Sequence, residues 1–230
     1  MKRFLLALII TVPLICCTTS AENLMHVSGT INGLRKGTLF LQKVQDSILV
    51  NLDSLEIKGN GNFSFEQFIE EPEIFYLYLE KADNNDFNDR ITFFGEKGTI
   101  TIRTTWNQFE QKAKITGSKN QMLFEQYKAM LSNFNKRDLE LSQISLAAED
   151  SINMDSIKAL VESNYRNHFK YIVNFALTNP NSYITPYIAI TDGKEINPIY
   201  LDSIYAILPD SIANSKYGKI LKTKVSKTKN

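Results

Sequence analysis

The stretch LDSLEIKGNGNFSFEQFIEEPEIFYLYLE, residues 52–80, decides the fold class. It holds three short runs rich in aliphatic and aromatic residues, in which apolar and polar positions alternate, and such alternation is typical of half-buried strands. Residues 58–62, KGNGN, separate the first two runs. Because Asn and Gly accept the positive φ of tight turns, this segment predicts a short hairpin turn between two strands.

Similar runs lie on both sides of this stretch. Eight segments are predicted as strands: residues 23–31, 37–44, 48–57, 62–68, 73–81, 90–94, 98–104 and 113–117. Residues 95–98, GEKG, predict a second tight turn that closes the next hairpin. Many short strands joined by hairpin turns favour an antiparallel β-sandwich or a barrel-like domain, to which we assign residues 24–118.

The composition changes near residue 118, after which glycine is scarce and apolar residues take helical spacing. Ser118 and Gln121 form a capping-box pattern, which predicts the start of a helix. A second helix is expected over residues 154–179, where Pro180 ends the pattern. Its apolar stripe is Ile157, Leu160, Val161, Tyr165, Phe169, Ile172, Val173 and Ala176. Shorter helices follow within residues 182–190, 198–208 and 215–222.

The fold class is therefore α+β, with an N-terminal antiparallel sandwich or barrel-like domain followed by an α-helical region over residues 119–225. Residues 226–230 form a basic tail, the end of a lysine-rich segment. We interpret this tail as solvated, with a weak contact to anionic headgroups or an acidic partner as the alternative.

The first 17 residues, MKRFLLALIITVPLICC, have the order of a secretory signal: two basic residues, an apolar run, then small and polar residues. We interpret residues 1–17 as a lipoprotein signal peptide that ends at a lipobox cysteine. Cys17 would then carry the lipid and tether the chain to a membrane. The alternative is conventional cleavage after Ala21.

Composition excludes several classes of chemistry. The chain has 2 cysteines, both in the signal segment, and 2 histidines, His26 and His168. A mature chain that begins at an acylated Cys17 has no free thiol for redox or nucleophilic chemistry. We predict no metal site and no cofactor. The 26 basic and 25 acidic residues argue against a dedicated nucleic-acid surface.

A further acidic segment, residues 83–89 (DNNDFND), offers carboxylate and amide oxygens that suit calcium. Its spacing differs from an EF-hand loop, so we favour an ordinary polar loop. The sequence also has no Gly-x-Ser-x-Gly, His-Glu-x-x-His or P-loop motif, and we predict that the protein is not an enzyme.

The order of these motifs along the chain is similar to that of a known domain family. Residues 27–44, 52–80, 91–102 and 113–127 together resemble the domain of unknown function 4369, and the resemblance covers about residues 24–130. That domain usually stands at the N-terminus of Bacteroidota envelope lipoproteins, ahead of a thioredoxin-like domain. Residues 175–190, FALTNPNSYITPYIAI, are similar to the segment that joins the two domains in that family.

The resemblance carries over no catalytic residue, because the family's Cys-x-x-Cys site lies in the thioredoxin-like domain and this sequence stops at Asn230, where that domain would begin. The resemblance implies a binding or scaffold lipoprotein, with a separate thioredoxin-like envelope protein as one possible partner. In that lineage, acidic residues just after the cysteine are associated with surface export. Glu22 is the one acidic residue close to Cys17, so we expect the periplasmic face of the outer membrane.

The candidate contact residues are aromatic. In the predicted strand over residues 73–81, Tyr76 and Tyr78 share a face with Ile74, while Phe75, Leu77 and Leu79 share the other. One face must be core. The other is either a contact surface for a partner or is covered by the helical region. Trp106 is a second candidate contact. The alternatives for function are a small-ligand-binding lipoprotein and a hydrolase that uses carboxylates or hydroxyls.

Overall fold

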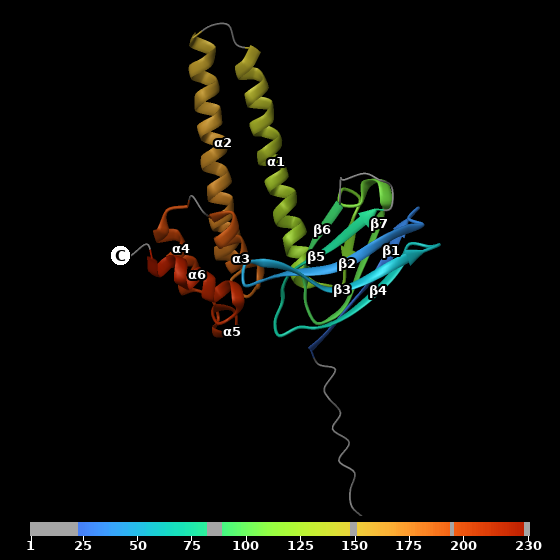
Figure 1. The fold of residues 1–230 in the computed structure, drawn as a ribbon. Helices are drawn as coiled ribbons and strands as arrows, with labels where there is room; N and C mark the ends of the chain where they lie inside the picture. The colour runs from blue at the N-terminus through green and yellow to red at the C-terminus, as the bar shows by residue number, and fades with distance from the viewer. Residues whose placement is uncertain (1–22, 82–88, 148–150, 194–195, 228–230) are drawn as a thin grey trace, which may run out of the picture.

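The computed structural model describes residues 23–81, 89–147, 151–193 and 196–227. Two four-stranded sheets form the N-terminal region and, within the described residues, six α-helices follow them. The α+β class is therefore confirmed. The sheets pack face to face on one side of the molecule, and the helices lie on the other side (Figure 1).

The first sheet has the strand order β4-β1-β7-β8. Its strands are β1 (Leu24–Asn32), β4 (Asn62–Phe68), β7 (Gly98–Thr105) and β8 (Lys114–Thr116). One pairing departs from the expected antiparallel arrangement, because β1 runs parallel to β7. These two strands are far apart in sequence, and the intervening strands supply the long crossover connection that a parallel pair needs.

The second sheet has the order β3-β2-β5-β6 and is antiparallel throughout. Its strands are β2 (Lys36–Gln45), β3 (Ile48–Lys58), β5 (Glu73–Lys81) and β6 (Asp89–Gly95). Asp46 and Ser47 form the turn between β2 and β3, with φ of 48° and 67°. Neither residue is a glycine, but aspartate tolerates the left-handed region better than most residues.

The eight strands lie where alternation predicted them, but the two predicted turns have another role. Gly59 and Gly98 have φ of +95° and +105°, as tight turns require. However, KGNGN joins β3 of the second sheet to β4 of the first, and GEKG joins β6 to β7 in the same way. The prediction that these turns close hairpins is wrong: they carry the chain between the layers of the sandwich.

The sandwich core lies between the two sheets. Alternate residues of β1 fill it from one side, and Phe75, Leu77 and Leu79 of β5 fill it from the other, each fully buried. Gly29 interrupts the β1 row, because a Cβ at this position would lie 1.7 Å from the carbonyl oxygen of Ile102. Only glycine allows this close approach of two strands.

Two long helices form a hairpin that projects away from the rest of the molecule (Figure 1). They are α1 (Lys119–Ala147) and α2 (Ser151–Thr178). Ser118 caps α1 as predicted, because its Oγ accepts a hydrogen bond from the Gln121 N–H at 2.9 Å. The reciprocal bond of the capping box is replaced: Gln121 Oε1 accepts from the backbone N–H of Phe94 at 2.7 Å and so joins α1 to β6.

The predicted stripe of α2 is only partly core. Ile172, Val173 and Ala176 are buried, whereas Leu160, Val161 and Tyr165 are 47%, 42% and 51% exposed. Their expected burial is therefore wrong. The reason is the hairpin itself: among the described helices, only α1 lies beside this half of α2 (Figure 1).

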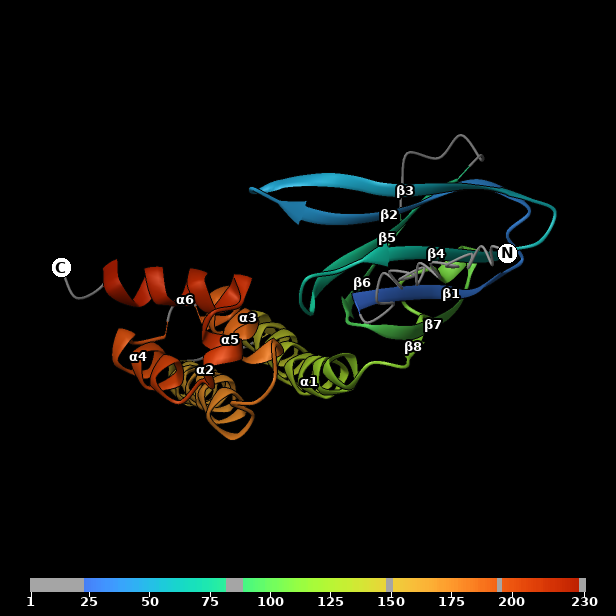
Figure 2. The same cartoon turned by 90° about the horizontal axis from the view of Figure 1, so that it is seen from below.

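Four short helices pack around the base of the hairpin. They are α3 (Ile184–Thr191), α4 (Pro198–Ala206), α5 (Asp210–Ala213) and α6 (Lys216–Lys227). Three of them were predicted, and α5 was not. Seen from below, they form a layer beside the ends of the sheets (Figure 2). Within the described residues, no helix is long and apolar enough to span a membrane.

Candidate functional site

The outer face of the second sheet is divided between two environments. Near the start of β5 and the end of β6, Ile74 is 3% exposed and Phe94 is fully buried, and both belong to the core of the helical region. Tyr76 is half-buried and packs against the same core. The helical region therefore covers this half of the face, as one of the two interpretations predicted.

The other half of the face is partly exposed and carries an aromatic patch, which we define as Phe40, Tyr76, Tyr78 and Arg90. Phe40 and Tyr78 contact each other across β2 and β5, with ring centroids 5.8 Å apart. The guanidinium carbon of Arg90 lies 5.2 Å from the Tyr78 ring and 5.7 Å from the Tyr76 ring. These cation–π contacts fix an exposed arginine over two tyrosines. Tyr76 thus links the covered half of the face to the open half.

Gln42 lies beside the patch, opposite Tyr76 in the β2–β5 ladder. It is 6% exposed, and its Nε2 donates to Asn51 Oδ1 at 2.7 Å. Its Oε1 is buried and has no hydrogen-bond partner among the described residues. A buried amide oxygen without a partner is costly, so a donor from a bound molecule would improve this site.

Charged and polar contacts fix the helices against the second sheet. Glu73 is 6% exposed and accepts from Lys43 Nζ at 2.9 Å and from Lys216 Nζ, in α6, at 2.5 Å. Beside it, the backbone N–H of Ile74 donates to the Tyr217 hydroxyl at 3.1 Å. Burial raises the pKa of Tyr217 above its ordinary value, so this hydroxyl stays neutral. The position of the patch relative to α6 is therefore well defined.

A cleft with a volume of about 780 Å³ lies at the junction of the two regions. On the sheet side it is lined by residues 69–72 and by Glu96 and Lys97. The helical side supplies Asn120 and the turn over residues 178–183. This turn lies within residues 175–190, the segment noted in the sequence.

Hydrogen bonds hold the cleft wall in place. Glu96 accepts from the backbone N–H of Lys119 at 2.5 Å and from the Asn120 side chain, so a carboxylate stabilises the first turn of α1. Asn120 Oδ1 in turn accepts from Ser182 Oγ at 2.9 Å and from the Tyr183 N–H at 3.2 Å. The other residues that line the cleft also carry carboxylate, amide and hydroxyl groups, which can form hydrogen bonds with a polar ligand. A cleft of this size suits a small molecule.

Comparison with known families identifies the sheet region. Residues 25–124 match the model of the family described as Domain of unknown function (DUF4369). This part of the chain is a DUF4369 domain. The resemblance noted in the sequence is confirmed, and the match ends at Phe124, shortly after α1 begins. No curated protein and no solved structure matches the chain significantly.

Trp106, the third contact residue predicted from the sequence, lies in the DUF4369 domain but outside the aromatic patch. It follows β7 of the first sheet and is 41% exposed. Its ring covers Gly33, and Lys81 Nζ lies 5.9 Å from the ring centroid. Trp106 therefore closes one end of the sandwich and is separate from the Tyr76 and Tyr78 face.

Sequence reasoning found two members of the patch and missed two. The alternation of β5 identified Tyr76 and Tyr78, but Phe40 and Arg90 come from β2 and β6, and their contacts depend on the strand order of the sheet. A usable signal exists for Phe40: it alternates with the buried Leu39 and Leu41, and so it must face outward.

The remaining predicted residues have the following places. His26 Nδ1 lies 3.5 Å from Glu66 on the outside of the DUF4369 domain. His168 stacks on Phe134 with centroids 5.2 Å apart, and its buried Nε2 has no partner among the described residues. Within the described chain, no group of three or more metal-ligating side chains occurs. Cys17 and nearly all of the acidic loop over residues 83–89 lie outside the described residues.

Proposed function

We propose that the protein is a non-catalytic, membrane-anchored envelope lipoprotein that acts as a binding or scaffold module through the aromatic patch of its DUF4369 domain. The observation that carries this proposal is the half-covered second sheet: the helices bury Ile74 and Phe94 but leave Phe40, Tyr78 and Arg90 accessible. Tyrosine and arginine dominate the binding energy of protein interfaces when a partner buries them.

The patch is also suited to binding by its rigidity. Arg90 is exposed but is positioned by two tyrosine rings, and Tyr76 is held against the helical core. Side chains that are ordered before binding lose less conformational entropy when a partner covers them. Beside the patch, the buried amide oxygen of Gln42 has no hydrogen-bond partner among the described residues, so a donor that reached it would be stabilising.

The anchor is part of the proposal. The signal segment ends at Cys17, and acylation there would hold the protein on a membrane, for which we propose the periplasmic face of the outer membrane. Confinement to one surface raises the effective concentration of two anchored proteins without any new contact. A thioredoxin-like envelope protein is the partner to test first, because of the family resemblance. Neither a nucleic acid nor a cofactor is required.

The anchor is tested by labelling cells with a fatty-acid analogue and comparing the wild-type chain with Cys17→Ala. We expect label on the wild type alone, together with recovery of the wild type in the membrane fraction. Equal labelling of both chains, or label on neither, would show that Cys17 is not the acylated residue.

Binding through the patch is tested by crosslinking in intact cells, followed by mass spectrometry of the proteins recovered with the tagged chain. Tyr78→Ala should lose the partner. Tyr200→Ala is the matched control, because Tyr200 is 51% exposed but lies in α4, outside the patch. If Tyr78→Ala and Tyr200→Ala recover the same envelope proteins as the wild type, the patch is not the binding surface.

The cleft of about 780 Å³ favours a second candidate function, the binding of a small polar ligand. Native mass spectrometry of the fragment from Thr18 onward would detect a retained molecule. Asn120→Ala should release it, because Asn120 joins both walls of the cleft. Recovery of no envelope protein, together with a retained ligand, would favour this function over the scaffold.

A further inference from the structure

Phe68 is an exposed aromatic residue close to Asn23, where the described part of the chain begins. It is the last residue of β4, it is 68% exposed, and β4 is an edge strand of the first sheet. It pairs with Leu24, the first residue of β1. Its neighbour Ile69 is only 5% exposed and donates its N–H to the carbonyl of Asn23 at 3.0 Å. Ile69 is therefore packed at this end of the sandwich, whereas the side chain of Phe68 is largely exposed.

The length of the preceding chain limits how far Phe68 can lie from a lipid on Cys17. Six residue steps separate Cys17 from Asn23, and a fully extended chain of that length spans at most about 20 Å. Leu24, one step further along the chain, pairs with Phe68, and paired strands lie about 5 Å apart, so the backbone of Phe68 is within about 30 Å of the lipid attachment point. A compact connection would bring it closer.

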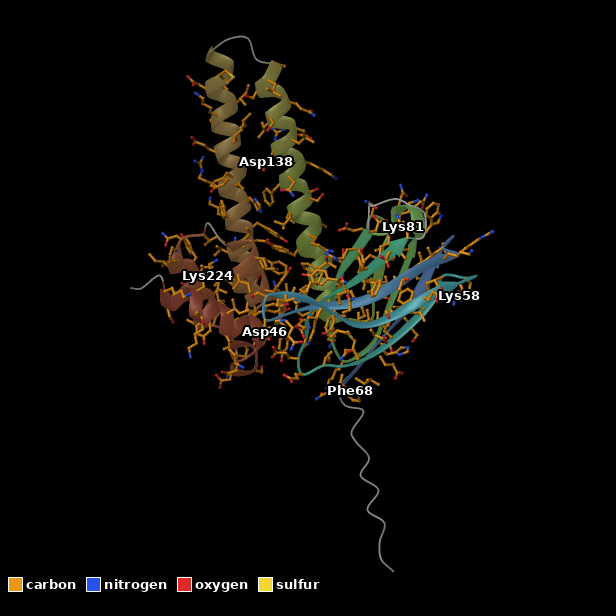
Figure 3. All side chains as sticks on the ribbon, in the orientation of Figure 1. Asp46, Lys58, Phe68, Lys81, Asp138 and Lys224 are labelled. Atoms are coloured by element: carbon orange, nitrogen blue, oxygen red, sulfur yellow. The ribbon has the colours of Figure 1, made fainter. Side chains whose placement is uncertain are left out.

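The helical hairpin lies at the other end of the molecule. Phe68 lies at the end of the sandwich where β1 begins, and the α1–α2 hairpin projects in the opposite direction (Figure 3). Leu146, in the last turn of α1, is about 40 Å along the helix axis from Lys119. When the chain is tethered at its N-terminus, Phe68 is thus close to the bilayer and Leu146 is remote from it.

We propose that the end of the sandwich around Asn23 and Phe68 rests on the anchoring bilayer, and that the Phe68 ring enters its interfacial region. This inference rests on the proposed acylation of Cys17. The tether makes one aromatic side chain sufficient, because the contact is intramolecular once the lipid is inserted. The aromatic patch and the hairpin then face the space where a partner can reach them.

The charges around Phe68 define the type of membrane surface. Glu66 and Glu70 are exposed close to it in sequence, and Glu71 is half-buried next to Glu70. Glu71 accepts a hydrogen bond from the backbone N–H of Lys216, and Glu66 lies 3.5 Å from His26 Nδ1. The remaining negative charge repels anionic headgroups, so this end fits a zwitterionic surface better than an anionic one.

The test uses the full-length chain, purified with its lipid and reconstituted into vesicles of phosphatidylcholine that contain lipids brominated near the headgroup. Trp106 is the only tryptophan in the sequence, so Trp106→Phe removes the background signal. Two reporters are compared in this background, Phe68→Trp and Leu146→Trp. Both positions are exposed, at 68% and 89%, so neither change disturbs the core.

We expect the brominated lipids to quench the Phe68→Trp chain and to leave the Leu146→Trp chain unchanged. Replacing part of the phosphatidylcholine with phosphatidylglycerol should reduce the quenching. An acylated, vesicle-bound chain in which neither reporter is quenched, or in which both are quenched equally, would overturn this inference and leave the lipid anchor intact. If the mass of the purified chain shows no lipid, the proposed anchor fails, and this inference fails with it.

Discussion

Replacing Glu73 with glutamine should loosen the helices from the second sheet. The Glu73 side chain is 8% exposed and holds two lysines, Lys43 and Lys216, that are 24% and 32% exposed. The substitution keeps the size of the side chain but leaves two partly buried ammonium groups without their carboxylate. Breaking a buried ion pair costs about 3–5 kcal/mol. Because both lysines keep some contact with water, we expect a loss of about 2–3 kcal/mol in unfolding free energy.

Urea denaturation of the fragment from Thr18 onward measures this loss. Glu56→Gln is the matched control, because Glu56 forms an ion pair with Lys58 in which both side chains are more than half exposed. Exposed pairs contribute about 0–1 kcal/mol, so the control should stay close to the wild type. If Glu73→Gln and Glu56→Gln cost the same, the Glu73 cluster does not fix the helices to the sheet.

Three further changes test the rest of the fold. Gln121→Ala removes the acceptor of the buried Phe94 N–H and should cost about 1–3 kcal/mol in urea denaturation. Gly29→Ala places a Cβ against the Ile102 carbonyl and should cost about 3 kcal/mol or more, or abolish soluble expression; near-wild-type stability would contradict the close strand approach.

The third change, Tyr187→Phe, tests the pH dependence. Burial, followed by the nearby Tyr76 and Asp192, raises the pKa of Tyr187 to about 12 from 10.0. Above pH 10 the unfolded chain therefore loses this proton first, and the unfolding free energy falls as the pH rises from about 10 to 12. Tyr187→Phe should make this fall shallower in urea titrations, and an identical slope would show that Tyr187 does not contribute to it.

The sequence located the strands well because their signals are local. In β5, burial of Phe75, Leu77 and Leu79 follows directly from alternation, and this face could be assigned before the structure was known. The pairing of strands was not accessible in the same way. The parallel contact of β1 with β7 depends on residues more than 60 positions apart, and the turns at Gly59 and Gly98 are compatible with a hairpin or with a crossing between sheets.

The site was predictable only in part for the same reason. Tyr76 and Tyr78 could be placed on a common face, but the sequence could not decide whether helices cover that face. The structure gives a mixed result: Tyr76 packs against the helical core, and Tyr78 contacts Phe40 and Arg90 on the open half. The exposed half of α2 was missed because an apolar stripe specifies a contact face but not whether a third layer is present.

The residues matched by the family model do not coincide with the residues that fold together. The DUF4369 match ends at residue 124, yet Ile74 and Phe94, which lie inside it, are buried in the core of the helical region. Removing the helices would expose both side chains. The loss of apolar burial would cost about 2 kcal/mol of folding free energy for each side chain. Gln121 and Lys216 add polar contacts across the same boundary. The helices therefore complete the second sheet, and the exposed surface of that sheet depends on both regions together. The DUF4369 domain supplies the aromatic patch, and the helices determine how much of its face remains uncovered.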